Sequence, residues 1–481
     1  FENHGNELID RPENKNFYHY LNVEGNKASN YYSTGSPSQP NYISLATGDT
    51  WGVTTNAQWP CIPAGDTVNV PTESDPSLGE HRVPDFKSLE CGGRWGYPEA
   101  ALNLKNRRNM FTSMYQAGMA TRVYSGSMDP GQDPRTGGQG NKNILGANKT
   151  DRYNKGKVEA MMRGLYAVKH HPAMAFDEVR NRPDFFKNLT RTLGGGQWET
   201  SIEAYAKDQN ISWNARQFEN DLKSGEVGVL NYLIPDQCDN MHGQGASVVD
   251  CDGYYEYDED YHPIVQRGDQ YVKYLVDTIK ASPVWQNPHR RVAIVLLFDE
   301  GAEFYGAASC CGWNPGREIG VGDRGKPLGE ADGMPDAANY TSGNKGDGPT
   351  IFGVLTNQAA APKGIVDSDA YSHFSFVRTM QDMFGLADPG VATSYMNRSK
   401  YTEDYIRTNL NSLPEYQGSA DPHFDAVRPM NHKYVSQPGE WRSGVKDGST
   451  FRADLGMPPS LVDSNRAAGP DKTQTNIWAV K

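Results

Sequence analysis

The feature that most restricts the fold is an uninterrupted apolar run, residues 292–298, that ends directly in two carboxylates. A run rich in Val, Ile, Leu and Phe is typical of a β-strand covered on both faces. It therefore predicts a central strand of a sheet. Asp299 and Glu300 follow at its carboxyl end, and ligand sites in open α/β sheets lie at that edge.

Helix-like and strand-like segments alternate along the chain. Apolar residues recur at helical spacing in residues 161–167, 218–222 and 265–279, and residues 227–234 are rich in strand-forming side chains. This alternation predicts an α/β fold with a mixed, mostly parallel sheet between helices.

Two stretches differ from this core in composition. Residues 307–349 are rich in Gly, Asp and Asn with little periodicity, which indicates a loop-rich insertion. Periodicity is weak again in residues 387–481, but aromatic residues remain frequent there, which argues against free disorder. We therefore predict a core over residues 1–386 that carries the insertion, and a C-terminal extension over residues 387–481 that wraps around it.

Composition argues against two classes of partner. The chain of 481 residues has 47 Lys and Arg against 59 Asp and Glu, a formal charge of −12, so it lacks the basic excess of nucleic-acid-binding proteins. No apolar run approaches the roughly 18 residues that a membrane-spanning helix needs. We predict no nucleic-acid partner and no transmembrane segment, and the composition leaves the oligomeric state open.

The six cysteines favour disulfides, because none forms a Cys-x2-Cys pair and no His follows at zinc-ligand spacing. Pairing by proximity joins Cys61 to Cys91, Cys238 to Cys251, and Cys310 to Cys311. Potential glycan acceptors in Asn-x-Ser/Thr triplets are Asn148, Asn188, Asn210, Asn339 and Asn397. We predict a secreted or periplasmic protein. Because the sequence begins with Phe rather than Met, we expect that processing or an incomplete sequence has removed what preceded it.

Asp299 and Glu300 are the strongest single candidates for a metal site. Adjacent carboxylates repel each other and lose solvation together when buried, so they persist most easily beside a cation or a basic group. A hard divalent cation suits such oxygen ligands. The alternative is that the two acids cap a following turn.

Two earlier segments carry further polar ligands. Glu2 and Asn3 offer a carboxylate and an amide that suit a hard cation or a phosphate. Ser38 lies in a hydroxyl-rich turn, residues 32–48, that runs into a possible helix. Near a helix N-terminus, backbone N–H groups and the helix dipole would point at a bound anion. The alternative is a turn bounded by prolines and capped by serines.

Three histidines stand in short polar segments. His170 lies in the sequence KHHP, His242 in PDQCDNMHG and His373 in YSHFS. Histidine can donate a hydrogen bond to a phosphate or protonate a leaving alkoxide. Taken singly, each of them is more simply explained as an ordinary hydrogen-bonded residue.

Taken in order, these segments resemble one family. The chain has Glu-Asn near its start, then Pro-Ser-Gln-Pro-Asn-Tyr, Lys-His-x-Pro, the His242 segment, a strand ending in Phe-Asp-Glu, and a late Tyr-Ser-His-x-Ser-x-x-Arg-Thr-x-x-x-x-Phe-Gly-Leu. This series, together with residues 110–128, resembles the phosphoesterase family of secreted acid phosphatases and bacterial phospholipases C, in the alkaline phosphatase superfamily. The resemblance spans residues 1 to about 386 and implies an alkaline-phosphatase-like core.

The resemblance also implies roles for particular residues. Ser38 would be the nucleophile, and the ligands of one divalent metal ion of unknown identity would be Glu2, Asn3, Ser38, Asp299 and Glu300. His170 and His242 would contact the phosphoryl group of a phosphate ester substrate, and His373 would have a supporting or structural role. Such a site fits the chemistry, because phosphoryl transfer needs a positioned nucleophile and positive charge on the non-bridging oxygens.

The chain departs from the family pattern directly after Glu300. The family often has Gly-Gly followed by an aromatic residue, Asp and His, whereas this chain reads GAEFYG. Three functions therefore stay open. The first is a secreted phosphomonoesterase or phosphodiesterase with a phosphoseryl intermediate. The second is a phospholipase C or another ester hydrolase at the same site, and the third is a non-catalytic surface or assembly protein on this scaffold.

Overall fold

The computed structural model describes residues 1–34, 38–48, 67–69, 80–82, 108–128, 166–176, 179, 189–193, 217–243, 263–301, 350–368, 371–387, 396, 430 and 477–478. The chain divides into two units, and each is described by itself. The first contains residues 1, 58–93 and 120–290, and the second contains residues 2–57, 94–119 and 291–481.

The first unit contains a parallel three-stranded sheet. β5 (Thr121–Ser125) lies between β6 (Thr190–Thr192) and β7 (Leu230–Ile234). Val123 of β5 is opposite Thr190 on one side and Tyr232 on the other. β7 confirms the strand predicted within residues 227–234. A separate antiparallel pair is formed by β3 (Thr67–Asn69) and β4 (Glu80–Arg82).

The helices of the first unit follow the predicted apolar spacing. α9 (Gln217–Ser224) and α10 (Pro263–Lys280) confirm the helices predicted at residues 218–222 and 265–279, and α11 (Pro283–Gln286) follows. The buried face of α10 includes Ile264, Gly268, Tyr271, Leu275 and Ile279. These residues recur every three or four positions, as an amphipathic helix requires. The helix predicted at residues 161–167 lies almost entirely outside the described residues.

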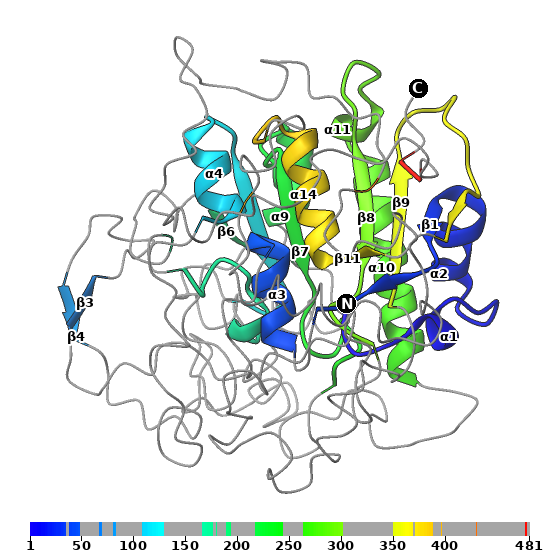
Figure 1. Cartoon of the computed structure of the whole chain (residues 1–481), viewed down its shortest axis with the longest axis horizontal. Coiled ribbons are helices and arrows are strands. Elements are labelled where there is room, and N and C mark those ends of the chain that lie inside the picture. The colour runs from blue at the N-terminus through cyan, green and yellow to red at the C-terminus, as the bar shows by residue number, and fades with distance from the viewer. Residues whose placement is uncertain are drawn as a thin grey trace, which may run out of the picture. The chain divides into compact units, whose positions relative to one another are not determined.

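The second unit contains a mixed four-stranded sheet with the order β10-β1-β9-β8. Its strands are β1 (Asn26–Ala28), β8 (Ala293–Leu297), β9 (Phe352–Thr356) and β10 (Val366–Asp367). β9 runs antiparallel to both β1 and β8, beside which it lies in Figure 1, whereas β10 is parallel to β1. Among the described residues this sheet is therefore mixed, as predicted, and the β10–β1 pair is its parallel one.

β8 confirms the strand predicted at residues 292–298 but not its position. Within the sheet that the described residues form, β8 is an edge strand. Ile294 and Leu296 are buried, whereas Val295 and Leu297 are partly exposed. The partly exposed side chains contradict the predicted cover on both faces, while the central position of the strand stays a prediction. An apolar run shows that a strand is hydrophobic, but strand order is set by pairing with residues far away in the sequence.

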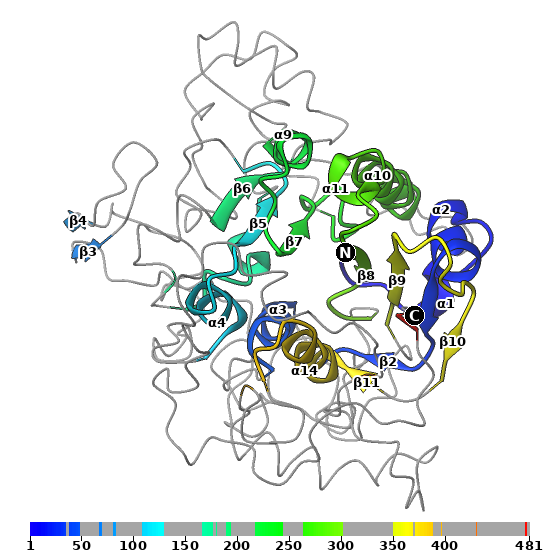
Figure 2. The same ribbon diagram turned by 90° about the horizontal axis from the view of Figure 1, so that it is seen from above.

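A short parallel pair leads into two helices of the second unit. β2 (Tyr31–Tyr32) pairs with β11 (Tyr371–Ser372). α14 (His373–Met383) follows β11 directly, and α3 (Ser38–Thr47) follows β2. The two helices pack side by side (Figure 2), and α4 (Met110–Gln116) also contacts α3. Ser372 caps α14 by accepting a hydrogen bond from the backbone N–H of Phe374, at 3.2 Å.

The second unit has an aromatic core around Phe352. Tyr31 stacks on Phe352 with ring centroids 4.5 Å apart, and Phe376 and Trp478 make edge contacts at 5.2 and 6.0 Å. Trp478 belongs to the predicted C-terminal extension, of which the structure describes residues 387, 396, 430 and 477–478. The insertion predicted at residues 307–349 lies outside the described residues. The division into core, insertion and extension therefore stays a prediction.

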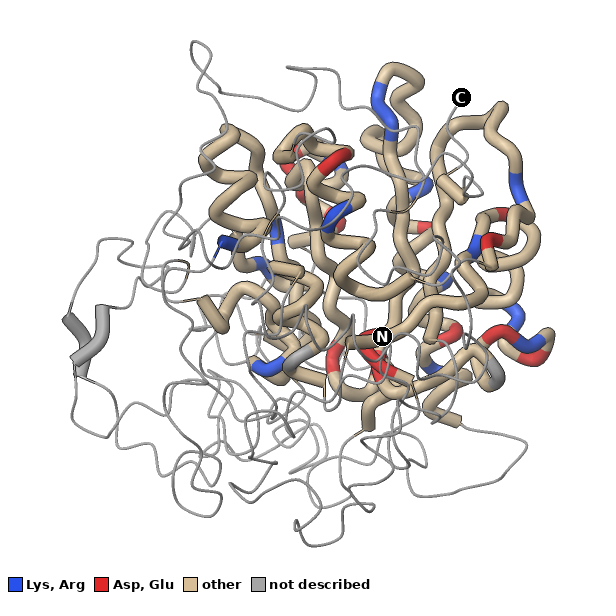
Figure 3. Tube along the Cα trace, viewed as in Figure 1, with Lys and Arg blue, Asp and Glu red and all other residues tan. Residues whose placement is uncertain are grey.

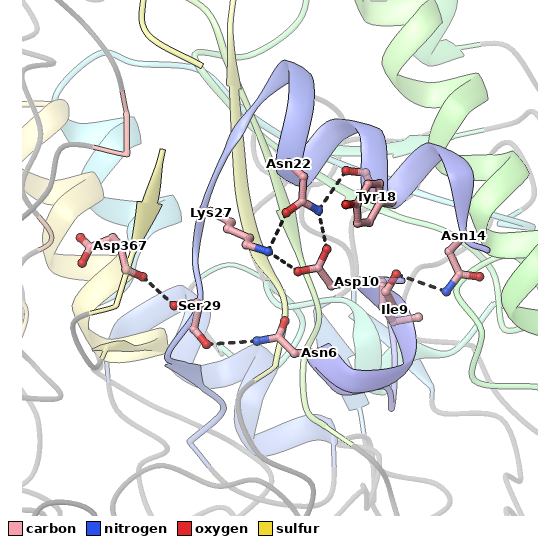
Figure 4. Close-up of polar contacts among 9 residues, drawn as sticks. All are labelled: Asn6, Ile9, Asp10, Asn14, Tyr18, Asn22, Lys27, Ser29 and Asp367. Carbon is pink, nitrogen blue, oxygen red and sulfur yellow. Dashed lines mark hydrogen bonds and ion pairs between the residues drawn. The ribbon is translucent and has the colours of Figure 1, made fainter. Parts of the chain in front are cut away.

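The N-terminal segment is fixed to this unit by a small polar cluster. α1 (Asn6–Ile9), α2 (Lys15–His19) and the π-helical turn η1 (Tyr20–Glu24) precede β1. Lys27 of β1 forms an ion pair with Asp10 and donates to Oδ1 of Asn22 at 2.7 Å, while Nδ2 of Asn22 donates to Oδ1 of Asp10 at 2.5 Å (Figure 4). We call Asp10, Asn22 and Lys27 the N-terminal latch.

A second set of contacts ties α1 to the sheet. Nδ2 of Asn6 donates to the carbonyl oxygen of Ser29 at 3.2 Å, and Oγ of Ser29 donates to the carbonyl oxygen of Asp367 at 3.1 Å (Figure 4). The latch and these bonds join the N-terminal residues to β1 and β10. The residues before β1 are therefore held to the sheet by side-chain contacts.

The described elements confirm the α/β class. Whether the core is alkaline-phosphatase-like stays a prediction. Among the residues that the structure describes, no helix combines the length and the apolar character needed to cross a membrane.

Candidate functional site

Ser38 lies between two of the predicted metal ligands in the second unit. Its Oγ is 3.0 Å from Oε2 of Glu2 and 3.3 Å from Oε1 of Glu300. All three side chains are buried. A hydroxyl group has one hydrogen, so Ser38 can donate fully to only one of the two carboxylates at a time. Because 36 and 262 residues separate Ser38 from its partners, only the fold brings them together.

α3 begins at Ser38, so the possible helix after the hydroxyl-rich turn is present and Ser38 lies at its N-terminus. The backbone N–H and Oγ1 of Thr34 both donate to Oδ1 of Asn41, at 2.9 and 3.1 Å. These bonds connect the segment that precedes α3 to the first turn of the helix. The first turn of an α-helix leaves backbone N–H groups without partners inside the helix, and these groups favour a bound anion. Ser38 therefore lies where an anionic ester can be stabilised.

Asp299 meets the N-terminal segment. The backbone N–H of Asn3 donates to Oδ1 of Asp299 at 3.2 Å, and Figure 3 shows acidic residues in red beside the N-terminus. Asn3 is buried and has a φ of 59°, a left-handed conformation that Asn adopts more readily than most residues. We call Glu2, Asn3, Ser38, Asp299 and Glu300 the acid–serine cluster. The structure brings these residues together, and their role as ligands of one ion stays a prediction.

Tyr42 is a site residue that the sequence analysis missed. Its hydroxyl donates to Oε1 of Glu2, while Ser38 donates to the other oxygen of the same carboxylate. Residues four apart share one face of an α-helix, so Ser38 and Tyr42 of α3 both reach Glu2. The signal was present, because Tyr42 is the last residue of the Pro-Ser-Gln-Pro-Asn-Tyr motif.

Burial makes charge costly in the acid–serine cluster. It raises the pKa of Glu2 well above its usual value, and repulsion from Asp299 raises this pKa further, while the hydrogen bond from Tyr42 lowers it. Burial also raises the pKa of Asp299. Buried carboxylates without a counter-charge favour their neutral forms. The cluster therefore calls for protons or for a cation.

The residues present fit a hard divalent cation. Three carboxylates, a hydroxyl and an amide provide oxygen donors, and divalent cations such as Mg²⁺ and Ca²⁺ prefer oxygen ligands. Oδ2 of Asp299 receives no hydrogen bond from the described part of the chain. A cation held by Glu2, Asn3, Ser38, Asp299 and Glu300 would offset the repulsion that raises the pKa of Glu2.

His373 contacts the backbone of a predicted ligand. Its ring is fully buried, and its Nε2 lies 2.6 Å from the carbonyl oxygen of Asp299. Burial lowers the pKa of His373 to about 4 although the backbone contact opposes this shift, so the imidazole is neutral at pH 7. This placement agrees with a supporting role rather than with contact to substrate.

His170 and His242 lie together in the first unit and form a histidine pair. Their ring centroids are 5.4 Å apart. His170 ends the 3₁₀ helix η3 (Val168–His170) and is buried, whereas His242 follows β7 in a loop and is partly exposed. Burial lowers the pKa of His170 well below its usual value, and the positive charges of Lys169 and His242 lower it further. The structure brings the two predicted histidines together, and their roles stay predictions.

The ring orientation of His242 restricts what it can do. Nδ1 lies 2.8 Å from the carbonyl oxygen of Gly243, and the backbone N–H of His242 donates to Oδ1 of Asn240, also at 2.8 Å. A carbonyl oxygen only accepts, so Nδ1 carries the hydrogen. In the neutral ring Nε2 is then an acceptor, and His242 can donate a proton from Nε2 only when the ring is cationic.

Two predictions about modification and cross-linking fall mainly outside the described residues. All five predicted glycan acceptors lie there, as do five of the six cysteines. Cys238 is buried and disulfide-bonded. The predicted pairing of Cys238 with Cys251 and the other pairings stay predictions. His171, next to His170, is buried, and burial lowers its pKa to about 3.

A family model with the description Phosphoesterase family matches residues 12–387 of the chain. The chain belongs to the Phosphoesterase family. The match includes Ser38, the histidine pair and the two acids after β8, whereas Glu2 and Asn3 precede it. Membership confirms the resemblance predicted from the sequence and supports the hydrolysis of phosphate esters.

Two solved structures of Ps i-CgsB are similar to this chain at low identity. The structure in complex with k-i-k-neocarrahexaose has 13% identity and a TM-score of 0.32, and covers 82% of this chain and 71% of the other. A second structure of Ps i-CgsB has 12% identity and a TM-score of 0.33 with the same coverage. TM-scores this low carry no argument about fold or activity. No curated protein matches this chain.

Proposed function

We propose that this protein is a metal-dependent phosphoric ester hydrolase in which Ser38 attacks phosphorus and carries the phosphoryl group as a phosphoserine intermediate. The observation that carries this proposal is the position of Ser38. Its Oγ lies at the first residue of α3 and within hydrogen-bond distance of two buried carboxylates. A serine that only caps a turn would not explain why two buried carboxylates from distant segments lie beside its hydroxyl.

The residues of the cluster divide the work of the first step. Glu2 and Glu300 orient the hydroxyl of Ser38, and Tyr42 holds the second oxygen of Glu2 so that Oε2 faces Ser38. A divalent cation would be held by the five residues of the cluster, and when bound it would lower the pKa of the serine hydroxyl and neutralise charge on the phosphate oxygens. The P–O bond to the alcohol breaks as the bond to Oγ forms, and the proton that leaves Oγ is balanced by the proton that the departing alcohol takes up.

A second step restores the serine. Water attacks the phosphoserine, the Oγ–P bond breaks, and phosphate leaves while Oγ regains a proton. The N-terminus of α3 would favour the negative charge of the phosphoryl group in both steps. The contacts of His170 and His242 with the phosphoryl group stay predictions of the family resemblance.

The test is phosphate release from p-nitrophenyl phosphate, an alkyl phosphate, a phosphodiester and phosphatidylcholine, each with and without a chelator. Phosphatidylcholine is assayed by phosphocholine release. We expect hydrolysis of at least one ester, loss of activity in EDTA and its return on adding Mg²⁺, Mn²⁺, Ca²⁺ or Zn²⁺. Preference for phosphatidylcholine would identify the phospholipase C alternative. No hydrolysis of any ester, including a sulfate ester, would support the non-catalytic alternative.

The intermediate has its own test. Rapid quenching in acid during turnover, followed by mass spectrometry, should find phosphate on the peptide that contains Ser38. The same experiment on Ser38→Ala serves as the control. If the ester turns over but no phosphorylated Ser38 is found in a burst experiment, the covalent mechanism is wrong and water attacks phosphorus directly.

We also propose that the protein is secreted or periplasmic. The even number of cysteines and the bonded state of Cys238 support this location. Labelling with a thiol reagent after extraction should detect thiols only after reduction. Free thiols in the freshly extracted protein would contradict an oxidising compartment.

A further inference from the structure

The backbone carbonyls of the two acids after β8 are held by side chains from two other segments. Nε2 of His373 lies 2.6 Å from the carbonyl oxygen of Asp299, and Oγ1 of Thr350 donates to the carbonyl oxygen of Glu300 at 3.2 Å. His373 and Thr350 are both fully buried. Neither residue contacts the carboxylates through these bonds, so both act on the peptide groups from which the carboxylates project.

Tyr31 connects the two contacts. Its hydroxyl lies 2.9 Å from Nδ1 of His373, and its own carbonyl oxygen accepts a hydrogen bond from the backbone N–H of Thr350 at 2.7 Å. The ring of Tyr31 is fully buried and stacks on Phe352. One residue of β2 thus supports Asp299 through its side chain and Glu300 through its main chain.

The direction of the hydrogen bonds follows from the acceptor. A carbonyl oxygen cannot donate, so Nε2 of His373 carries the hydrogen that faces Asp299. In a neutral imidazole Nδ1 is then an acceptor, and the Tyr31 hydroxyl must donate to it. The chain of donors runs from Tyr31 through His373 to Asp299, and the Tyr31 hydroxyl fixes the tautomer that this chain needs.

We infer that Tyr31, His373 and Thr350 form a carbonyl brace that positions Asp299 and Glu300 for cation binding without touching the substrate. The inference rests on the proposed function, because it assumes that these acids hold a cation. Ligand positions must be accurate for tight binding, and residues that orient ligands from behind commonly matter for affinity. The three residues of the brace are positioning residues.

Tyr371 provides a matched control. It is the register partner of Tyr31 in the β11–β2 pair, it is fully buried, and its hydroxyl donates to Oδ2 of Asp367 at 2.8 Å. Tyr31→Phe and Tyr371→Phe each remove one buried hydroxyl from the same two-stranded sheet. Only Tyr31→Phe breaks the brace. Any effect that comes merely from losing a buried hydrogen bond should appear in both variants.

The experiment measures cation affinity of the metal-free full-length chain by isothermal titration calorimetry, with Mg²⁺, Mn²⁺, Ca²⁺ and Zn²⁺ tested singly. We expect Tyr31→Phe and His373→Leu to raise the Kd about 10- to 100-fold. Tyr371→Phe should leave the Kd unchanged even where it lowers the Tm. His373→Gln should recover part of the affinity, because its amide N–H can reach the carbonyl oxygen of Asp299.

Thr350 supplies a second, independent pair of variants. Thr350→Val removes the donor to Glu300 at nearly constant volume, whereas Thr350→Ser keeps it. A weaker Kd for Thr350→Val than for Thr350→Ser supports the brace, and equal values overturn it. This pair decides the question if Tyr31→Phe fails to fold.

The outcomes separate the brace from the proposed function. Equal Kd values for Tyr31→Phe and Tyr371→Phe, in a wild-type protein that binds a cation and releases phosphate, overturn the brace alone. Equal Kd values for His373→Gln and His373→Leu do the same. A wild-type protein that binds none of the four cations overturns both the brace and the metal-dependent function.

Discussion

The acid–serine cluster and the histidine pair differ in how the chain holds them. Contacts in the cluster join residues 36, 262 and 296 positions apart. His242, in contrast, is oriented by Gly243 and Asn240, its own neighbours in the sequence. The geometry of the cluster therefore depends on the completed fold of its unit, whereas the orientation of His242 is encoded within a few residues.

The two regions also differ in the charge that they favour binding. Burial raises the pKa of Glu2 and lowers the pKa of His170, so each group is driven toward its neutral form. A bound cation would favour the ionised form of Glu2 in the acid–serine cluster. A bound anion would favour the protonated form of His170 in the histidine pair. This contrast suggests experiments that disturb one region at a time.

The largest effect is expected from removing the nucleophile of the cluster. Ser38→Ala eliminates the group that accepts the phosphoryl unit, so turnover should fall on the order of 10³-fold or more on every ester. A better leaving group should not restore it. Steady-state phosphate release is the measurement, and an unchanged circular dichroism spectrum is the control. A Ser38→Ala protein that keeps its turnover would refute the covalent mechanism.

The histidine pair should fail differently. If His242 protonates the leaving oxygen, His242→Ala should lower turnover of an alkyl phosphate by about 10²- to 10⁴-fold and affect p-nitrophenyl phosphate much less, because nitrophenolate leaves without a proton. The Nδ1–H bond to Gly243 requires a cationic ring for this role. Equal losses on both esters would show that His242 grips the phosphate instead.

Without a cation, the contribution of Glu2 to the free energy of unfolding should depend on pH. The folded-state pKa of Glu2 is raised above the ordinary value of 4.5, so the metal-free folded state binds more protons than the unfolded state above that pH. Its contribution to stability is present below pH 4.5 and is lost as pH rises through the folded pKa. In EDTA, Glu2→Gln should therefore be more stable than wild type at pH 7 and equally stable at pH 4.

Adding the cation should reverse this order. At a free concentration of 100 times the Kd, wild type should gain about 2.7 kcal/mol in the free energy of unfolding, and Glu2→Gln should gain less. Thermal unfolding with and without EDTA at the two pH values measures both effects. Glu2→Gln that is less stable than wild type at pH 7 in EDTA would contradict the raised pKa.

The smallest effect is expected from the N-terminal latch, which supports the segment that carries Glu2. Lys27→Met leaves Asp10 without its ion-pair partner, and the exposed fractions of the two side chains are only 17% and 14%. We expect a loss of about 1.5 kcal/mol in the free energy of unfolding, measured by urea denaturation. Lys273→Met breaks the ion pair of α10 with Asp277, whose side chains are 49% and 53% exposed, and should cost less than about 0.5 kcal/mol. Equal losses would show that the latch contributes no more than a surface pair.

Local signals in the sequence predicted much of the secondary structure. The helix that begins at Ser38, α10 and β8 follow from turn residues, helical spacing and an apolar run, and each of these signals lies within the element itself. The position of β8 at the edge of its sheet could not be predicted in this way. Strand order depends on pairing between β8 and β9, which lie on either side of a stretch outside the described residues.

The candidate site was predictable as a set of residues but not as a network. Spacing alone could not bring Glu2 to Ser38, and only the resemblance of ordered motifs to a family placed them together. The donation from Tyr42 and the contact of His373 with the carbonyl oxygen of Asp299 depend on ring positions fixed by packing. The Nδ1–H tautomer of His242, in contrast, depends on the carbonyl oxygen of its sequence neighbour Gly243.

The carbonyl brace also bears on how the protein is made. The cluster joins Glu2 to Glu300, and the brace also needs His373, so the brace cannot be complete until the 371 residues that follow Glu2 have been translated. Closing such long loops costs only slightly more entropy than closing shorter ones, because the cost grows with the logarithm of loop length. Asp299 and Glu300 therefore lack the support of His373 until that later segment has been made, whereas the entropy of loop closure adds little further cost. Under the proposed function, tight cation binding would mark a finished domain, and a stalled or truncated chain would leave its acids solvated and without a bound cation.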